Sequence, residues 1–169
     1  MRTIDTIYMH HSESDWGSAK EIDRWHKARG WRGIGYHFVV LNGRPRSSGE
    51  YIPDLDGSIE HGRPITQMGA HVLGHNNNSV GICLIGGAIT QAQVDAAVKL
   101  CRELLDDYPS ITAILGHNEA PGASTECPGA LDMPEFREQV FARPCDGVVI
   151  ERDGDFVTIT IPRERIPWN

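Results

Sequence analysis

A histidine and a cysteine, both good metal ligands, stand ten positions apart in one stretch rich in Gly and Pro. The stretch spans residues 116–129, with His117 near its start and Cys127 near its end. A catalytic zinc takes three protein ligands and keeps a fourth position open, so a third ligand must come from elsewhere. His10 is the best candidate, because it follows the apolar run of residues 4–9. Taken singly, each of these residue types is more often an ordinary surface or core residue.

Two nitrogens and one sulfur form a donor set that suits zinc. The neighbouring His11 competes with His10 for the third position. Because consecutive side chains of a strand point to opposite faces, only one of the two can reach the metal. Such a site would polarise a carbonyl group and lower the pKa of a bound water toward 7.

The elements that must position these ligands are short strands. Residues 4–9 predict a buried strand that ends at His10, and residues 111–115 predict one that delivers His117. Alternating apolar residues and a continuous apolar run predict two more strands. These lie at residues 36–41 and 80–85, and Asn42-Gly43 and Asp56-Gly57 are predicted turns.

Three helices are predicted from their capping residues. Ser18 and Glu21 form a predicted capping box, and the first helix runs to about Ala28. His26 stands on this helix, and we expect it to be exposed. Thr90 with Gln93 begins the second helix, and Asp132 begins the third. The second helix carries an apolar stripe of Val94, Ala97, Val98, Cys101, Leu104 and Leu105.

The composition excludes several classes of protein. The net charge of −7 argues against nucleic acid as the main partner. No apolar run approaches the roughly 18 residues of a membrane span, and the N-terminus lacks the features of a signal peptide. We therefore expect a chain made in the cytoplasm. Of the four cysteines, Cys83 and Cys101 are expected in the core, and Cys145 carries no signal.

Four segments together resemble the type 2 N-acetylmuramoyl-L-alanine amidases, a family that includes phage lysozyme-amidases and peptidoglycan-recognition proteins. They are Ile7-Tyr-Met-His-His-Ser12, residues 30–39, residues 74–87 and residues 116–129. The resemblance spans about residues 4–141 and is closer to the phage branch. It implies an α/β fold, a mixed central sheet flanked by helices on both sides. It also implies one Zn²⁺ per chain and selects His10 over His11 as the ligand beside His117 and Cys127.

The resemblance also implies roles for other residues. Tyr36 would donate a hydrogen bond to the oxyanion of the transition state; an ordinary strand tyrosine at the rim is the alternative. Phage relatives carry Lys two positions before the cysteine, where this chain has Thr125. Active animal relatives also have Thr there, so the change does not imply lost activity. His71 and Asn77, in the polar stretch before residue 80, are expected to bind substrate.

Two segments depart from the family pattern. About a dozen extra residues, roughly 42–55, either extend a substrate groove through Tyr51 and Ile52 or form a tolerated surface loop. The amidase domain is expected at residues 1–143. Residues 144–169 are expected to form a β-hairpin extension that packs on the domain or on a partner.

The function expected from the resemblance is zinc-dependent cleavage of the bond between N-acetylmuramic acid and L-alanine in peptidoglycan. Phage or prophage lysis is the expected setting, with action on the wall after release. A cytosolic amidase that recycles wall fragments is a variant of this expectation. A peptidoglycan-binding module without catalysis is the alternative, but such modules typically lack the cysteine ligand. The sequence does not indicate the oligomeric state or a regulatory protein partner.

Overall fold

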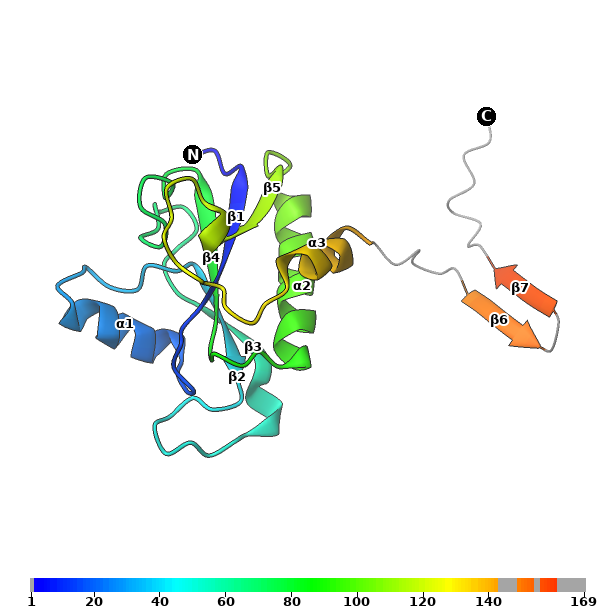
Figure 1. Ribbon diagram of the computed structural model, residues 1–169, viewed down its shortest axis with the longest axis horizontal. Coiled ribbons are helices and arrows are strands. Elements are labelled where there is room, and N and C mark those ends of the chain that lie inside the picture. Colours follow the sequence, from blue (N-terminus) through cyan, green and yellow to red (C-terminus); the bar gives the residue numbers. More distant parts are fainter. Residues whose placement is uncertain (1, 143–148, 154–155, 161–169) are drawn as a thin grey trace.

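The centre of the molecule is a five-stranded mixed sheet (Figure 1). The computed structural model describes residues 2–142, 149–153 and 156–160. The sheet order is β3-β2-β4-β1-β5, with β1 parallel to β4 and β5, and β2 parallel to β4 but antiparallel to β3. The strands are β1 (Thr6–His11), β2 (Phe38–Asn42), β3 (Asp56–His61), β4 (Ser79–Leu84) and β5 (Ala113–Gly116). The predicted fold class is confirmed.

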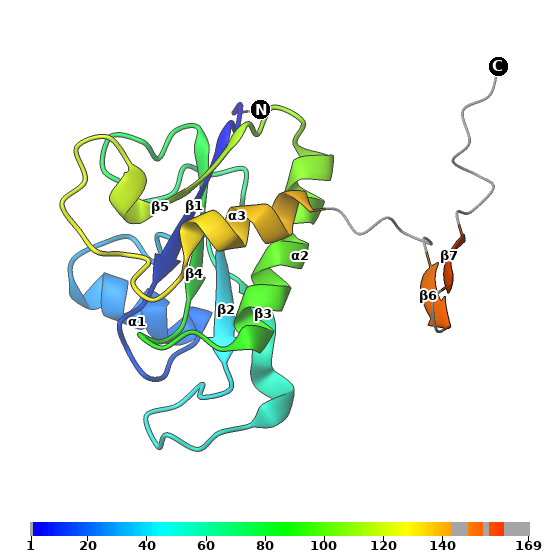
Figure 2. The same cartoon turned by 45° about the vertical axis from the view of Figure 1, so that its right-hand side comes forward.

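Helices cover both faces of the sheet (Figure 2). One face packs against α2 (Gln91–Asp107) and α3 (Met133–Phe141), in a core that includes Met9 and Ile82. The other face packs against α1 (Ala19–Ala28) through a smaller cluster that includes Ile22. Because strand side chains alternate, β1 contributes to both faces.

The helix starts agree with the predicted caps, with one difference. Thr90 and Gln93 form a complete capping box, and the Asp132 carboxylate accepts from the Glu135 amide. Ser18 accepts from the Glu21 amide, but Glu21 does not complete the box, because its carboxylate pairs with Arg24 at 2.6 Å. The first-turn amide of Ala19 donates instead to Glu60 of β3 at 2.6 Å.

The connection between β2 and β3 differs from its prediction at one end. Asn42 is the last residue of β2, and the chain bends directly after it at Gly43, with φ +74°, close to the predicted turn. Asp56 and Gly57 belong to the start of β3, so the predicted Asp56-Gly57 turn is wrong. Gly57 does adopt φ +79°, and the pairing of β2 with β3 shifts register nearby. The backbone therefore makes a bulge there rather than a turn.

The C-terminal part contains the predicted pair of strands. β6 (Val149–Asp153) pairs antiparallel with β7 (Phe156–Thr160) in a two-stranded sheet of its own. Gly154, between the two strands, and Cys145 lie outside the described residues, so the packing of the predicted extension stays a prediction. Within the described part of the chain, no helix is long and apolar enough to cross a membrane.

Candidate metal centre

The structure brings His10, His117 and Cys127 together. One ligand atom from each lies within 4.8 Å of the others, and they form the only such cluster found among the described residues. His10 and Cys127 are buried, and His117 is partly exposed. Ligand distances of 2.0–2.3 Å would place three ligands of one zinc within about 4 Å of one another. Small side-chain rotations therefore suffice to hold a zinc ion.

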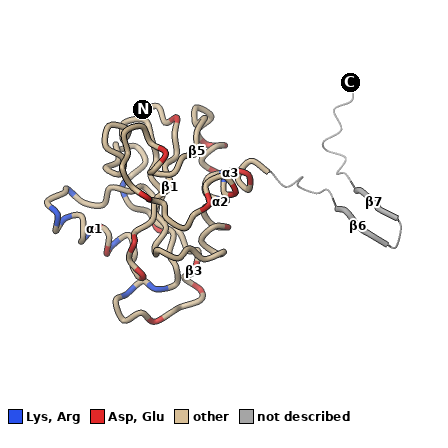
Figure 3. The backbone as a smooth tube through the Cα atoms, viewed as in Figure 1, with Lys and Arg blue, Asp and Glu red and all other residues tan. Residues whose placement is uncertain are grey.

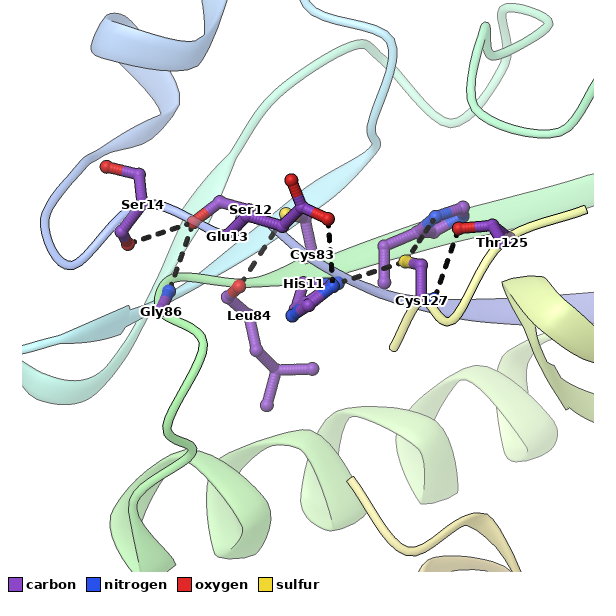
Figure 4. Close-up of polar contacts among 10 residues, drawn as sticks. His11, Ser12, Glu13, Ser14, Cys83, Leu84, Gly86, Thr125 and Cys127 are labelled. Atoms are coloured by element: carbon purple, nitrogen blue, oxygen red, sulfur yellow. Dashed lines mark hydrogen bonds and ion pairs between the residues drawn. The ribbon is translucent and has the colours of Figure 1, made fainter. Parts of the chain in front are cut away.

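The alternation of β1 separates His10 from His11. The His10 ring lies on the α1 side, where its Nδ1 is 3.6 Å from Cys127 Sγ and its ring centroid is 4.7 Å from that of His117. The His11 side chain lies next to Gly129, and its backbone amide donates to Cys127 Sγ at 3.4 Å (Figure 4). The hydrogen bond of His11 to the cysteine comes from its main chain, and the clustering of the ring of His10 with His117 and Cys127 favours His10 as the ligand.

Strand register explains why ligands distant in sequence meet. Met9 of β1 pairs with Gly116, the last residue of β5, so His117 emerges beside His10. The 3-10 turn η2 (His117–Glu119) follows, and the Asn118 amide donates to the Cys127 carbonyl at 2.7 Å. The Glu119 carboxylate accepts from the Gly116 amide and pairs with Arg137 of α3. These contacts fix both ends of the ligand loop.

The charge states of the apo site follow from burial. Burial, and then the neighbouring His71, His117 and His11, lower the pKa of His10 well below its usual value. Burial also lowers the pKa of His117 and raises that of the Cys127 thiol to about 11. At neutral pH the apo site thus holds neutral imidazoles and a protonated thiol, so binding a metal would release a proton.

His71 contacts a metal-ligand candidate directly. Its Nδ1 lies 3.2 Å from His10 Nε2, the ring nitrogen that faces away from Cys127. A side chain on Gly81 would come within 2.6 Å of the His71 ring, so the glycine leaves room for it. Asn76 holds the loop by accepting from the His71 and Val72 amides. The orientation of His71 fits a role in positioning His10 better than a role in binding substrate.

Tyr36 lies just before β2, with its ring centroid 5.0 Å from that of His10. Its hydroxyl interacts with the neighbouring Cys83 thiol. Burial, and then Cys83 and Cys127, raise the pKa of the hydroxyl well above its usual value, so it keeps its proton. Tyr36 can therefore act as a hydrogen-bond donor at this site. The sequence predicted Cys83 as a core residue, which is confirmed, but gave no sign of this contact.

His26 is buried, so its predicted exposure is wrong. It retains 6% of its accessible surface, and its Nδ1 accepts from the Gly35 amide at 3.0 Å. Its ring packs on Trp31 and Tyr36 at centroid distances of 4.5 and 5.6 Å. The spacing from Ile22, four residues earlier on the same helix face, is the signal that could have predicted this burial.

A cleft of about 200 Å³ is lined by two of the three ligand candidates, His117 and Cys127. We call it the site cleft; the buried His10 does not line it, and its other walls include His11, Ser12, Glu13, His26, Arg29 and Tyr36.

The two remaining predicted site residues do not line the site cleft. Thr125 is exposed, and its hydroxyl accepts from the Cys127 amide at 3.2 Å (Figure 4). Asn77 is exposed before β4, where its carbonyl accepts from Arg2. The contacts of the described residues do not join Asn77 to the ligand candidates.

Comparisons with known proteins agree with this geometry. Residues 1–130 match the family model described as N-acetylmuramoyl-L-alanine amidase. An endolysin of Klebsiella phage KP32 is 36% identical over 71% of this chain and 74% of its own length. An endolysin of Escherichia phage T7 is 33% identical over 81% of this chain and 87% of its own.

A solved structure supports the same conclusion. The N-acetylmuramoyl-L-alanine amidase LysC from Clostridium intestinale superposes with a TM-score of 0.70 at 29% identity, covering 84% of this chain and 88% of that one. The family match spans most of the chain, and the structural match includes the sheet that carries the ligand candidates. The chain belongs to the N-acetylmuramoyl-L-alanine amidase family.

Proposed function

We propose that this amidase hydrolyses the bond between N-acetylmuramic acid and L-alanine with one zinc ion held by His10, His117 and Cys127. The observation that carries the proposal is the convergence of two imidazoles and one thiol, of which His117 and Cys127 line the site cleft. Three such ligands are the usual complement of a catalytic zinc site. When bound, the ion would polarise the scissile carbonyl and lower the pKa of a coordinated water.

Tyr36 is the proposed donor to the oxyanion. It lines the site cleft with His117 and Cys127, and its hydroxyl keeps its proton at neutral pH. A donor of this kind acts mainly in the transition state, when negative charge develops on the carbonyl oxygen. Packing of the ring against those of His10 and His26, at centroid distances of 5.0 and 5.6 Å, would hold it in place until substrate arrives.

Thr125 is proposed to support catalysis from the ligand loop. Its hydroxyl oxygen accepts from the Cys127 amide, which leaves the hydroxyl hydrogen free to donate. It brings no positive charge, so it would stabilise an oxyanion less than a lysine would. The contact also keeps Cys127 oriented toward His10, so we assign Thr125 a positioning role in addition.

The two predicted substrate-binding residues differ in their support. His71 is better assigned to orienting His10, because its Nδ1 can accept the Nε2 proton while His10 Nδ1 faces the metal position. Asn77 keeps the proposed role of a peripheral substrate contact. Its exposed position is compatible with that role.

The charge distribution suggests where the peptide stem lies. The chain carries a net charge of −7, yet basic residues gather on α1 and the loop after it (Figure 3). Arg29, at the end of α1, lines the site cleft. Because stem peptides carry carboxylates, a basic rim attracts them. We infer that the peptide half of the substrate lies on the α1 side.

A wall digest tests this function. Purified peptidoglycan treated with the protein should yield peptides with a new N-terminal L-alanine and glycan strands with free lactyl carboxylates. A chelator should stop the release, and added zinc should restore it. New reducing sugar ends would identify a glycosidase and refute the proposal. Binding to the wall without release of peptide would identify a recognition module instead.

A further inference from the structure

A larger cleft lies beside the metal centre, where the extra residues of this chain form one wall. We call it the insertion cleft; it encloses about 690 Å³. Its lining follows the last residues of β1, β2 and β4, the strand ends at which open α/β sheets bind ligands. The lining residues used below are Asp15, Trp16, Arg44, Tyr51, Asp56 and Gly86. The connection that carries Arg44 and Tyr51 projects from the end of β2 (cyan in Figure 1).

Internal contacts fix the wall made by the insertion. The Arg44 carbonyl accepts from the Gly17 amide at 2.9 Å, and the Arg44 guanidinium lies 5.6 Å from the centre of the Tyr51 ring. The Tyr51 hydroxyl donates to Asp56 at 3.1 Å, and Thr90 donates to the other carboxylate oxygen of Asp56 at 2.7 Å. Tyr51 nevertheless remains 46% exposed. An aromatic ring is thus presented to the cleft in a fixed orientation.

The chemistry of the lining suits sugars. Tyr51 and Trp16 are amphipathic rings, and such rings can pack against the apolar C–H face of a pyranose. The Asp56 carboxylate accepts one hydrogen bond at each oxygen and keeps further lone pairs for hydroxyl groups. Trp16 is itself held by edge-to-face packing on Trp25, with ring centroids 5.2 Å apart. The rings of Tyr51 and Trp16 and the Asp56 carboxylate therefore lie in one cleft, each held by contacts with its neighbours.

The charge of the lining disfavours the other half of the substrate. Asp15 and Asp56 both line the insertion cleft, with Arg44 as their cationic neighbour. Stem peptides carry carboxylates, which two aspartates would repel. The site cleft has both Arg29 and Glu13 in its wall and so carries no acidic excess. The acidic excess of the insertion cleft thus disfavours a peptide stem there and is compatible with a neutral glycan.

The two clefts are neighbours along the segment after β1. Ser12 lines the site cleft, and its hydroxyl oxygen accepts from the amide of Gly86, which lines the insertion cleft, at 3.0 Å. Figure 4 shows Ser12, Ser14 and Gly86 grouped on one side of His11, with Cys127 on the other. A substrate held at the metal centre can therefore extend past Ser12 into the insertion cleft.

We propose that the insertion cleft is a subsite for sugar residues of the glycan strand, adjacent to the muramoyl unit whose amide is cleaved. This rests on the proposed amidase function. It also assigns the extra residues 42–55 a role in substrate binding rather than that of a neutral surface loop.

Binding can be tested without catalysis. The probe is the β-1,4-linked tetramer of N-acetylglucosamine, which contains no peptide and no scissile amide. We expect the full chain to bind it in an NMR titration with shifts at Trp16 and Tyr51. Tyr51→Ala should weaken binding about tenfold, the loss expected from removing a strong aromatic contact. Tyr51→Phe, which keeps the ring, should bind nearly as well as wild type.

Two control variants test whether the effect is specific. Phe141→Ala removes an aromatic side chain that is 57% exposed on α3, and Arg46→Ala removes a cation from the same loop as Arg44. Both should leave binding of the tetramer unchanged. The proposal is overturned if wild type does not bind the tetramer at millimolar concentration, or if Tyr51→Ala binds it as well as wild type does.

A kinetic comparison separates this proposal from the amidase function. The two substrates share the scissile bond but differ in glycan length: a one-sugar muramoyl dipeptide and a four-sugar muropeptide. In Tyr51→Ala the ratio of the KM for the four-sugar substrate to that for the one-sugar substrate should rise about tenfold. An unchanged ratio contradicts the subsite while leaving the amidase intact. If wild type cleaves neither substrate, the amidase function itself fails.

Discussion

The two faces of the central sheet use the same strands but differ in composition around β1. Ile7 and Met9 of β1 point into the apolar core under α2 and α3, which is fully packed. Tyr8 and His10, one residue away in each case, point to the α1 side, where His71, His117 and Tyr36 surround them. The first face obtains its free energy from burial of apolar surface. The second face contains histidines that burial keeps neutral.

A single register of β1 therefore positions both the apolar core residues on one face and the metal-ligand candidate His10 on the other. A slip of one residue in β1 would move His10 into the apolar core and Met9 into the site. The pairing of β1 with β4 on one side and β5 on the other prevents such a slip. The apolar face thus holds the strand whose other face carries the ligand candidates. If this is correct, changes on the two faces should have separable effects.

The largest effect is expected from the apolar face. Phe136 of α3 is 1% exposed in the core under the sheet. Phe136→Ala should lower the free energy of unfolding by about 3–5 kcal/mol, because it removes buried surface and leaves a cavity. Urea unfolding measures the loss. The zinc content of the folded variant should stay at the wild-type value, and a loss of metal would show that the faces are not separable.

A smaller effect is expected from the site face at Tyr36. Tyr36→Phe should lower kcat and kcat/KM by a similar factor, on the order of 100-fold, because the hydroxyl acts in the transition state. Stopped assays of peptide release give both constants. Stability and zinc content should barely change. A rise in KM with unchanged kcat would instead assign the hydroxyl to substrate positioning, and no change in either constant would make Tyr36 a packing residue.

The smallest effect is a pH dependence at His26. Burial, and then Arg29 and Arg63, lower its pKa to about 4, against about 6.5 in an unfolded chain. The unfolded state therefore takes up this proton first. The stability contribution is complete above pH 6.5 and is lost as pH falls toward 4. Since part of the ring borders the open site cleft, we expect a loss of about 1–2 kcal/mol rather than the full linkage value.

His26→Gln provides the comparison for this effect. The variant keeps an acceptor for the Gly35 amide but cannot be protonated, so its unfolding free energy should fall less between pH 7 and pH 4.5. His37, whose pKa burial also lowers to about 4, contributes equally to both proteins and cancels. Identical pH slopes for the two proteins would mean that His26 does not carry the expected proton linkage.

Local patterns were sufficient to predict most of the fold. Apolar runs predicted the buried strands, and caps at Thr90 and Asp132 predicted two helix starts. Because side chains alternate along a strand, the sequence predicted that His10 and His11 point to opposite faces, and the structure agrees. The prediction of a turn at Asp56-Gly57 was wrong because an Asp-Gly pair indicates only a local backbone preference. Pairing with β2 instead draws Asp56 into a strand.

The parts of the site that sequence could not predict depend on contacts between distant residues. His71 faces His10 because Gly81, on the neighbouring strand, leaves space for its ring. Tyr36 lies near Cys83 on the same face of the sheet, and neither residue type indicates that contact. His26 was assigned to the wrong side of its helix although its spacing from Ile22 was informative. The insertion cleft needed three strand ends and a loop to be placed together.

The zinc content of two single variants tests whether His10 is the third metal ligand. His10→Ala and His11→Ala change adjacent residues of the same strand, and both variants can be purified and measured by elemental analysis alongside wild type. We expect one zinc per chain in wild type and in His11→Ala, and a loss of most of the metal in His10→Ala. Full zinc in His10→Ala, or loss of zinc only in His11→Ala, would contradict this expectation.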